Sequence, residues 1–408
     1  MQNHPADQEP RRVLGSFFVS KTANPPTWEQ RKLGEVGQSF DYGLNAAAKE
    51  YDGQNKYLRI TDIDDSSRQF SMSDITSPDA NLEMSDDYRL RDGDILFART
   101  GASVGKTYLY RKSDGLVYFA GFLIRAKIKE DTSAEFIFQN TLTKSYAQYI
   151  AITSQRSGQP GVNAQEYAEY QLMIPKLPEQ KRVGAFLQKL DTLITLHQRK
   201  YEKLVNIKKS MLDKMFPKNG ASVPEIRFKG FTDPWEQRKL EEIAVRSPAM
   251  SDEEGLPRVE YEDIVSGAGR LNKDIKAKES TKAGIVFHKG DVLYGKLRPY
   301  LKNWLLASFN GLAVGDFWVL QPQDTDSSFL YRLVQSQQFD EVANQSTGTK
   351  MPRADWKLVS KTKFAVPKSV DEQVAIGAYF EYLDTLITLH QREPIIRILE
   401  VTSVKRNE

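Results

Sequence analysis

The 408-residue sequence contains no cysteine and only four histidines. Without cysteine there can be no disulfide bond, no thiolate nucleophile and no cysteine-ligated zinc. The histidines are too far apart in the sequence for a typical metal-binding motif: His4, His197, His288 and His390. The sequence also has no apolar run near the roughly 18 residues of a membrane helix, and its first 24 residues are charged where a signal peptide would be apolar. We therefore expect a cytoplasmic protein without metal-centred chemistry.

The overall composition is that of a globular protein. Hydrophobic residues make up 40% of the chain and charged residues 27%, and the length exceeds that of one ordinary core. The net charge of +3 is too small to indicate nucleic-acid binding by itself, because a phosphate-binding surface depends on local clusters of charge. We expect two domains and consider charge segment by segment.

An internal duplication organises the sequence. The decamer LDTLITLHQR at 190–199 recurs unchanged at 383–392, and WEQRKL at 28–33 recurs at 235–240. Weaker parallels lie between these ends, where YLRITDI and GDILF in the first copy match RVEYEDI and GDVLY in the second. The two copies therefore share their terminal motifs and differ in the segment between them, which we call the middle of each copy. Trp28 and Trp235 open the two copies as expected packing anchors.

The two middles are predicted to be α+β domains. Short apolar runs at 94–97, 121–129 and 317–320 indicate strands, whereas 134–151 and 327–343 indicate helices. Glycine-containing loops at 156–161 and 346–350 precede an apolar stretch that ends in Ile-Pro or Val-Pro. Each middle is therefore expected to end on an exposed loop and a last strand.

A long helix is predicted after each middle. Apolar residues at three-four spacing run from 179 to 216, between Pro178 and Pro217, and imply a helix of about 38 residues and roughly 57 Å. The second copy begins alike but meets Pro394, so we expect about 22 residues and roughly 33 Å there. On that basis Met211 to Phe216 should lack their usual partner. His197 and His390 occupy matching positions and are expected to face one another's helix as core residues.

These observations divide the chain into seven segments. They are an N-terminal extension (1–24), a first domain (25–177), a central helix (178–217), a linker (218–232), a second domain (233–369), a C-terminal helix (370–393) and an atypical tail (394–408).

Over residues 25–393 the combination of WEQRKL, Gly-Asp-(Ile/Val)-Leu and LDTLITLHQR resembles the specificity subunits of type I restriction-modification systems. The resemblance implies two target recognition domains in tandem repeat, each reading one half of a split double-stranded DNA sequence. It also implies that the two long helices pack as an antiparallel coiled coil with a pseudo-two-fold arrangement. The helices would thereby fix the distance between the two DNA half-sites. The implied partners are methyltransferase subunits, two of them, and restriction subunits. S-adenosylmethionine and adenine methylation would belong to the partners, and this chain would hold no cofactor and catalyse no reaction.

Two other functions compete with this interpretation. GASVGKT at 101–107 is similar to a phosphate-binding P-loop, although Thr100 stands where that motif requires glycine. A nucleotide-binding protein is therefore one alternative, and a duplicated scaffold without a DNA role is the other. NPPT at 24–27 and the acidic residues near Pro78 are incomplete versions of methyltransferase and nuclease motifs, and neither indicates catalysis.

The best candidates for DNA contact are basic and amide side chains in the glycine-flanked loops, because phosphates attract Lys and Arg while base edges pair with Arg, Asn and Gln. In the first domain they are Arg99, Thr100, Ser103, Lys106, Gln155, Arg156, Ser157, Gln159 and Asn163. In the second they are Lys296, Arg298, Tyr300, Lys302, Thr347, Thr349, Lys350 and Arg353. Segment 176–218 adds eleven Lys/Arg against four acidic residues. That charge fits either a helix near the DNA backbone or a solvated coiled-coil face.

Overall fold

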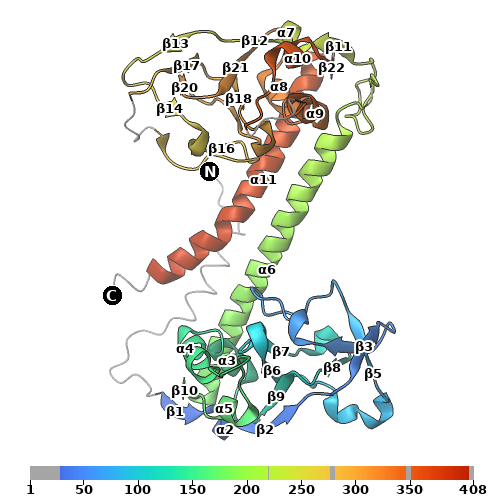
Figure 1. Cartoon of the computed structure of the whole chain (residues 1–408), viewed down its shortest axis with the longest axis vertical. Helices are drawn as coiled ribbons and strands as arrows, with labels where there is room; N and C mark the ends of the chain where they lie inside the picture. The colour runs from blue at the N-terminus through green and yellow to red at the C-terminus, as the bar shows by residue number, and fades with distance from the viewer. Residues whose placement is uncertain (1–27, 219, 276–280, 346–350, 404–408) are drawn as a thin grey trace, which may run out of the picture. The chain divides into compact units, whose positions relative to one another are not determined.

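The computed structural model describes residues 28–218, 220–275, 281–345 and 351–403, and the chain divides into two compact units between Leu196 and His197 (Figure 1). The first unit holds the first domain and the start of helix α6 (Leu177–Lys214). The second holds the rest of α6, the second domain and helix α11 (Val370–Ser403). No helix among the described residues is both long and apolar enough to cross a membrane.

The first domain is built around a four-stranded antiparallel sheet in the order β2-β9-β6-β7. Smaller pairs surround it: β1 with β10, β3 with β5, and β4 parallel to β8. The strands are β1 (Glu29–Lys32), β2 (Gly37–Tyr42), β3 (Ala47–Glu50), β4 (Lys56–Leu58), β5 (Thr76–Asp79), β6 (Ile95–Ala98), β7 (Thr107–Leu109), β8 (Val117–Phe119), β9 (Leu123–Ile128) and β10 (Gln171–Ile174). The helices are α2 (Leu33–Val36), α3 (Ala134–Asn140), α4 (Lys144–Thr153) and α5 (Ala164–Ala168).

The second domain repeats this plan. Its four-stranded sheet has the order β12-β21-β18-β19, and a second sheet has the order β13-β17-β20-β14, with β14 parallel to β20. The strands are β11 (Glu236–Lys239), β12 (Ala244–Arg246), β13 (Met250–Ser251), β14 (Arg258–Val259), β15 (Ile264–Val265), β16 (Arg270–Leu271), β17 (Gly284–Phe287), β18 (Val292–Gly295), β19 (Trp304–Leu306), β20 (Gly311–Ala313), β21 (Phe317–Pro322) and β22 (Lys363–Val366). The helices are α7 (Leu240–Ile243), α8 (Ser327–Leu333), α9 (Gln337–Ala343) and α10 (Trp356–Lys361). The prediction of two similar α+β domains is confirmed.

The repeated Gly-Asp pair forms the turn before the central strand of each domain. Gly93 and Gly290 have φ of +88° and +96°, which favours glycine because an L side chain is strained there. Asp94 and Asp291 are buried and accept a hydrogen bond from the backbone N–H three residues earlier, 2.8 Å long in both cases. The motif therefore fixes a turn and performs no chemistry.

Each helix predicted inside a domain is divided into two. Residues 134–151 form α3 and α4, and residues 327–343 form α8 and α9. The break has a local cause, because the hydroxyls of Thr143 and Ser336 accept hydrogen bonds from Tyr146 N and Phe339 N and so start a new helix. The helical spacing of apolar residues continues across both caps, so it predicted one helix where the structure has two.

The long helices match their predictions unequally. Helix α6 has 38 residues, as expected, but α11 continues through Pro394 to Ser403 and has 34. The prediction that the second helix ends near residue 393 is therefore wrong. Pro394 lacks the N–H that would bond to the carbonyl of His390, which removes one helical hydrogen bond but does not end the helix.

Within the second unit, α6 and α11 run antiparallel. His197 Nδ1 lies 3.0 Å from His390 Nδ1, Gln391 donates to the Tyr201 hydroxyl at 2.9 Å, and Lys208 Nζ lies 2.5 Å from Asp384 Oδ1. The expectation that the two histidines face one another is confirmed.

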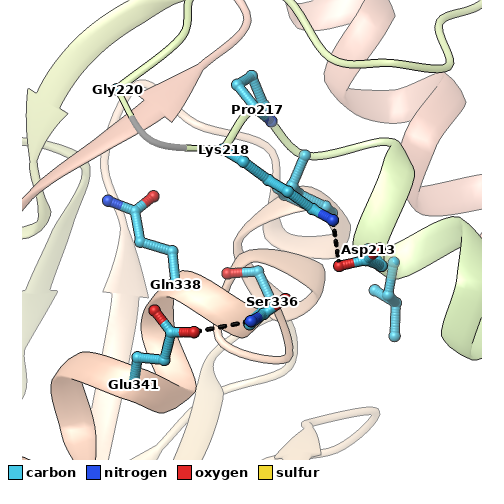
Figure 2. A pocket seen from close by; sticks show the side chains of 10 residues that line it. Asp213, Pro217, Lys218, Gly220, Ser336, Gln338 and Glu341 are labelled. Atoms are coloured by element: carbon cyan, nitrogen blue, oxygen red, sulfur yellow. Dashed lines mark hydrogen bonds and ion pairs between the residues drawn. The ribbon is translucent and has the colours of Figure 1, made fainter.

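The C-terminal end of α6 is not unpartnered, contrary to expectation. Met215 and Phe216 are buried, and the Phe216 ring stacks on Phe329 at 5.8 Å and meets Trp235 edge-on at 6.1 Å. The physical reason is the antiparallel pairing, which brings the end of α6 to the start of α11 rather than to its divergent end. Figure 2 shows the adjoining surface, a small hollow of about 240 Å³ between this end of α6 and α9. Two of its lining residues, Lys218 and Asp213, form an ion pair at 2.6 Å.

Each domain is attached to its own helix by the same two polar contacts. The indole N–H of Trp28 donates to Glu179 at 3.2 Å, and that of Trp235 donates to Glu372 at 3.2 Å. The next residue along, Gln180 or Gln373, is buried and accepts from the first N–H before α3 or α8 while donating to a proline carbonyl. The prediction that the tryptophans anchor the domains is supported, and the Glu-Gln pair explains where each anchor binds.

Candidate nucleic-acid interface

In the first domain the two predicted loops lie side by side. Thr100 and Gly161 form an antiparallel bridge, Gly101 N donates to the Pro160 carbonyl at 2.9 Å, and Val162 N donates to the Arg99 carbonyl at 2.9 Å. Gly101 has φ of +69°, and a Cβ there would lie 2.8 Å from Gln159 Nε2. The loop after β6 and the loop before α5 therefore form one surface.

The second domain makes the same arrangement with different residues. Leu297 and Arg353 form an antiparallel bridge, Arg298 N donates to the Pro352 carbonyl at 2.7 Å, and Ala354 N donates to the Lys296 carbonyl at 2.8 Å. The loop after β18 therefore lies beside the loop before α10. We call each of these surfaces the paired loops of its domain.

The side chains of the first paired loops differ in how free they are. Gln155, Ser157 and Gln159 are exposed, whereas Thr100 and Ser103 are partly buried. The Arg99 guanidinium lies over the Tyr42 ring, 5.0 Å from its centroid. None of these six residues makes an ion pair among the described residues, so each can offer a polar group to a ligand without breaking one.

Two other predicted DNA-contact residues of this domain form hydrogen bonds or ion pairs within the domain. Arg156 pairs with Glu166 and donates to the carbonyl of Thr153 at 2.8 Å, at the end of α4. Asn163 is the N-cap of α5, and its side chain accepts from Glu166 N at 2.9 Å. Both residues are exposed, but their contacts shape the loop.

Lys106 is held inside the domain. Its ammonium group lies 2.6 Å from Asp65, and its side chain is 14% exposed. Thr107 is buried and shares a hydrogen bond with Thr141 at 2.7 Å. The Lys106 ammonium group is therefore occupied by an ion pair, unlike the exposed side chains of the paired loops.

The same geometry rules out the P-loop alternative. A P-loop lysine and threonine face phosphate and metal and open a helix, whereas here Thr107 begins strand β7. The glycine before Lys106 has a packing reason, because Gly105 has φ of +82° and a Cβ would lie 2.6 Å from Ile150 Cγ2. The similarity to a nucleotide-binding motif is therefore accidental.

In the second paired loops an acidic residue lies among the cations. Asp316 is 3.1 Å from Arg353 and 3.5 Å from Lys296. Burial opposes ionisation of Asp316, but the hydrogen bond from Arg353 and the charges of both cations outweigh it and lower the pKa of the carboxyl. Asp316 is therefore ionised at neutral pH.

The remaining candidates flank a short 3₁₀ turn, η9 (Pro299–Leu301). Arg298 and Lys302 have φ of +50° and +55°, a strained conformation for residues with a side chain. Tyr300, between them, is 53% exposed, and Lys302 lies 3.5 Å from Asp340. Thr347, Thr349 and Lys350 lie outside the described residues.

Sequence reasoning missed Tyr42, Phe122 and Asp316, which border the paired loops. Phe122 and Asp316 follow a glycine and precede β9 and β21, so their position could be found by aligning the two copies. Their chemistry could not, because neither is basic or an amide.

The charge of the long helix is partly neutralised in the structure. Within the second unit Lys208 pairs with Asp384, Lys214 with Glu225 at 2.8 Å, and Lys218 with Asp213. Burial lowers the pKa of Lys208, although Asp384 opposes this effect. The exposed lysines of α6 fit either of the two predicted roles.

Comparison with known proteins agrees with the duplication. The family model of the type I restriction modification DNA specificity domain matches residues 25–206 and again residues 232–398. The MjaVIII type I restriction enzyme specificity subunit of Methanocaldococcus jannaschii is 23% identical over 329 residues, which cover 74% of this chain and 75% of that protein. The putative MjaX specificity subunit from the same organism is 28% identical over 204 residues, which cover 48% of this chain and 46% of that protein.

A solved structure shares the fold. The crystal structure of a type I restriction-modification system S subunit from M. genitalium superposes with a TM-score of 0.62 at 14% identity, covering 94% of this chain and 96% of that one. Since the family model matches both halves of the sequence, the chain belongs to the type I restriction-modification specificity-domain family and carries two copies of the domain.

Proposed function

We propose that this chain is the non-catalytic DNA-recognition subunit of a type I restriction-modification complex, and that each domain reads one half of a split double-stranded DNA sequence. The observation that carries the proposal is the presence of the same paired loops at equivalent places in both domains, with different polar side chains on them. A conserved backbone frame with variable side chains suits a reader whose two targets differ.

The helical segments suit the role of a spacer. Half-sites on DNA are separated in steps of about 3.4 Å per base pair, so a reader of two half-sites needs a stiff connection. Residues 197–214 of α6 are held against α11 by the Lys208–Asp384 ion pair and by apolar packing, which a flexible linker could not provide.

The chemistry belongs to the partners in this proposal. Methyltransferase subunits, two per chain, would hold S-adenosylmethionine and methylate adenine, and restriction subunits would translocate and cut the DNA. This chain would contribute recognition alone and would act in the cytoplasm.

A duplicated scaffold without a DNA role is the competing function. Long-read methylation sequencing of a host that carries this chain and its methyltransferase partner separates the two. A split methylated motif that disappears when this chain is deleted supports recognition. Active methyltransferase without any split motif would rule recognition out.

The independence of the two domains has its own test. Exchanging residues 155–159 should alter the first half of the motif only, and exchanging residues 298–302 should alter the second half only. Because each domain has its own core, neither exchange should reach the other half. Simultaneous change of both halves would contradict independent reading.

A further inference from the structure

One position differs sharply in chemistry between the two paired loops. Phe122 and Asp316 occupy the corner before β9 and β21, and their carbonyls accept hydrogen bonds from Arg99 N at 3.0 Å and Lys296 N at 2.9 Å. We call this place the corner position. In the second domain its side chain is an ionised acid bound to two cations, whereas in the first it is a phenyl ring that is 58% exposed.

The phenyl ring borders a hollow of about 720 Å³ whose other lining residues include Tyr42, Asn45, Arg59 and Arg99. No carboxylate is among the described residues that line it. Arg59 is bound to Asp62 at 2.9 Å, but Arg99 makes no ion pair within the described part of the chain and packs on Tyr42 instead. The hollow thus combines the exposed Phe122 ring, the rings of Tyr42 and Tyr57, and the guanidinium group of Arg99.

We propose that Phe122 stacks on a DNA base in the first half-site, while Arg99 binds the phosphate beside it. This inference rests on the proposed function, because it assumes that the first paired loops contact DNA. In a duplex the faces of the bases are covered by their neighbours, so Phe122 would reach one by entering between two base steps and partly unstacking them, as apolar side chains do in other DNA-binding proteins. The phosphate of that step offers Arg99 a negative charge. The backbone at Phe122 is held by Arg99 N, so the ring is presented on a fixed support.

The second domain lacks this stacking group at the corner position. Asp316 can accept hydrogen bonds from a base edge but has no face to stack on, and its charge would repel a phosphate if Lys296 and Arg353 did not neutralise it. Stacking at the corner position is therefore confined to the first half-site.

The test uses the full chain in complex with its methyltransferase partner and a duplex that carries the methylated motif found by sequencing. We expect Phe122→Ala to weaken binding of this duplex about 10- to 100-fold and Phe122→Trp to restore it. Met84→Ala is the matched control, because Met84 is an 83% exposed apolar residue of the same domain outside the paired loops. It should leave binding unchanged.

Duplexes with 2-aminopurine at successive positions locate the stacked base. Fluorescence should change on binding at one position of the first half-site with the wild-type complex and not with Phe122→Ala. Equal affinity of the wild type and Phe122→Ala would overturn the inference while leaving the proposed function intact. So would loss of methyltransferase from the Phe122→Ala complex before DNA is added, because Phe122 would then bind protein. Failure of the wild-type complex to bind the duplex would overturn the proposed function and the inference together.

Discussion

The two domains attach to their helices by the same contacts but with different completeness. Trp28 is 38% exposed and meets Phe136 edge-on at 5.7 Å, whereas Trp235 is 3% exposed and contacts both Phe216 and Phe329. The second domain shares one hydrophobic core with the end of α6 and the start of α11. The same tryptophan anchor is therefore a partly exposed surface contact in the first copy and a buried core residue in the second.

A polar contact between each domain and its long helix is also stronger in the second copy than in the first. In the first domain Gln139 donates to Asp191 at 2.7 Å, and in the second Arg332 donates to Asp384 at 2.8 Å. Asp384 also binds Lys208, so one carboxylate serves two cations, and Arg332 is almost fully buried. The second attachment is thus both more apolar and more strongly charged than the first.

Replacing the two tryptophans tests the larger difference. We expect Trp235→Ala to lower the free energy of unfolding of its unit by about 3 to 5 kcal/mol, because a buried ring leaves a cavity. Trp28→Ala should cost about 1 to 2 kcal/mol, since Trp28 is already 38% exposed to water. Urea unfolding of both variants measures the difference, and equal losses would contradict the comparison.

Replacing the two aspartates tests the polar difference. Asp384→Ala leaves Arg332 and Lys208 without their carboxylate and should destabilise the second unit by about 3 kcal/mol. Asp191→Ala removes one neutral-donor hydrogen bond at an exposed site and should cost about 1 kcal/mol or less. Thermal unfolding reports both, and a larger loss for Asp191→Ala would reverse the account.

Removing one cation from the second paired loops should have a smaller effect. Arg353→Ala is expected to weaken DNA binding about 5- to 10-fold on all sequences and to reduce the salt dependence by about one ion, if Arg353 binds phosphate. Binding at several salt concentrations measures both quantities. Lys357→Ala, an exposed residue on the neighbouring helix α10, is the control and should change neither. A change in the methylated motif without a change in salt dependence would instead assign Arg353 to a base.

The smallest expected effect concerns pH and the first domain. Hydrogen bonds from Ser67 and Ser66 lower the pKa of Asp64 from 3.8 to about 2. A carboxyl whose folded pKa is depressed stabilises the fold above its unfolded pKa, and that contribution is lost as the pH falls from about 4 towards 2. Wild-type protein should therefore lose slightly more stability than Asp64→Asn over this range, with Asp87→Asn as the control. Equal losses of stability with falling pH for the wild type and Asp64→Asn would argue against the hydrogen bonds from Ser66 and Ser67 to Asp64.

The sequence predicted most of the frame, because the frame is what the duplication preserved. The two domains, the strands around Gly93 and Gly290 and the full length of α6 all followed from repeated motifs and periodicity. The end of α11 did not, because a proline usually ends a helix and α11 continues past Pro394. The partner of Met215 and Phe216 was also missed, because periodicity shows that a face is apolar but not which segment returns to cover it.

The candidate site was predicted only in outline. Glycine punctuation located both paired loops, but the ion pair of Lys106 with Asp65 joins residues 41 positions apart in the sequence and cannot be found from local pattern. Phe122 and Asp316 were overlooked because a search for basic and amide groups does not select them. Their shared position, after a glycine and before β9 or β21, is confirmed by the strand register of the two sheets.

The most direct measurement is the methylation motif of a host that carries this chain with exchanged residues 155–159 or 298–302. The account predicts a split motif with the wild type, a change confined to one half for the first exchange, and a change confined to the other half for the second. A continuous motif, or a change in both halves from a single exchange, would contradict the claim that the two domains read DNA independently.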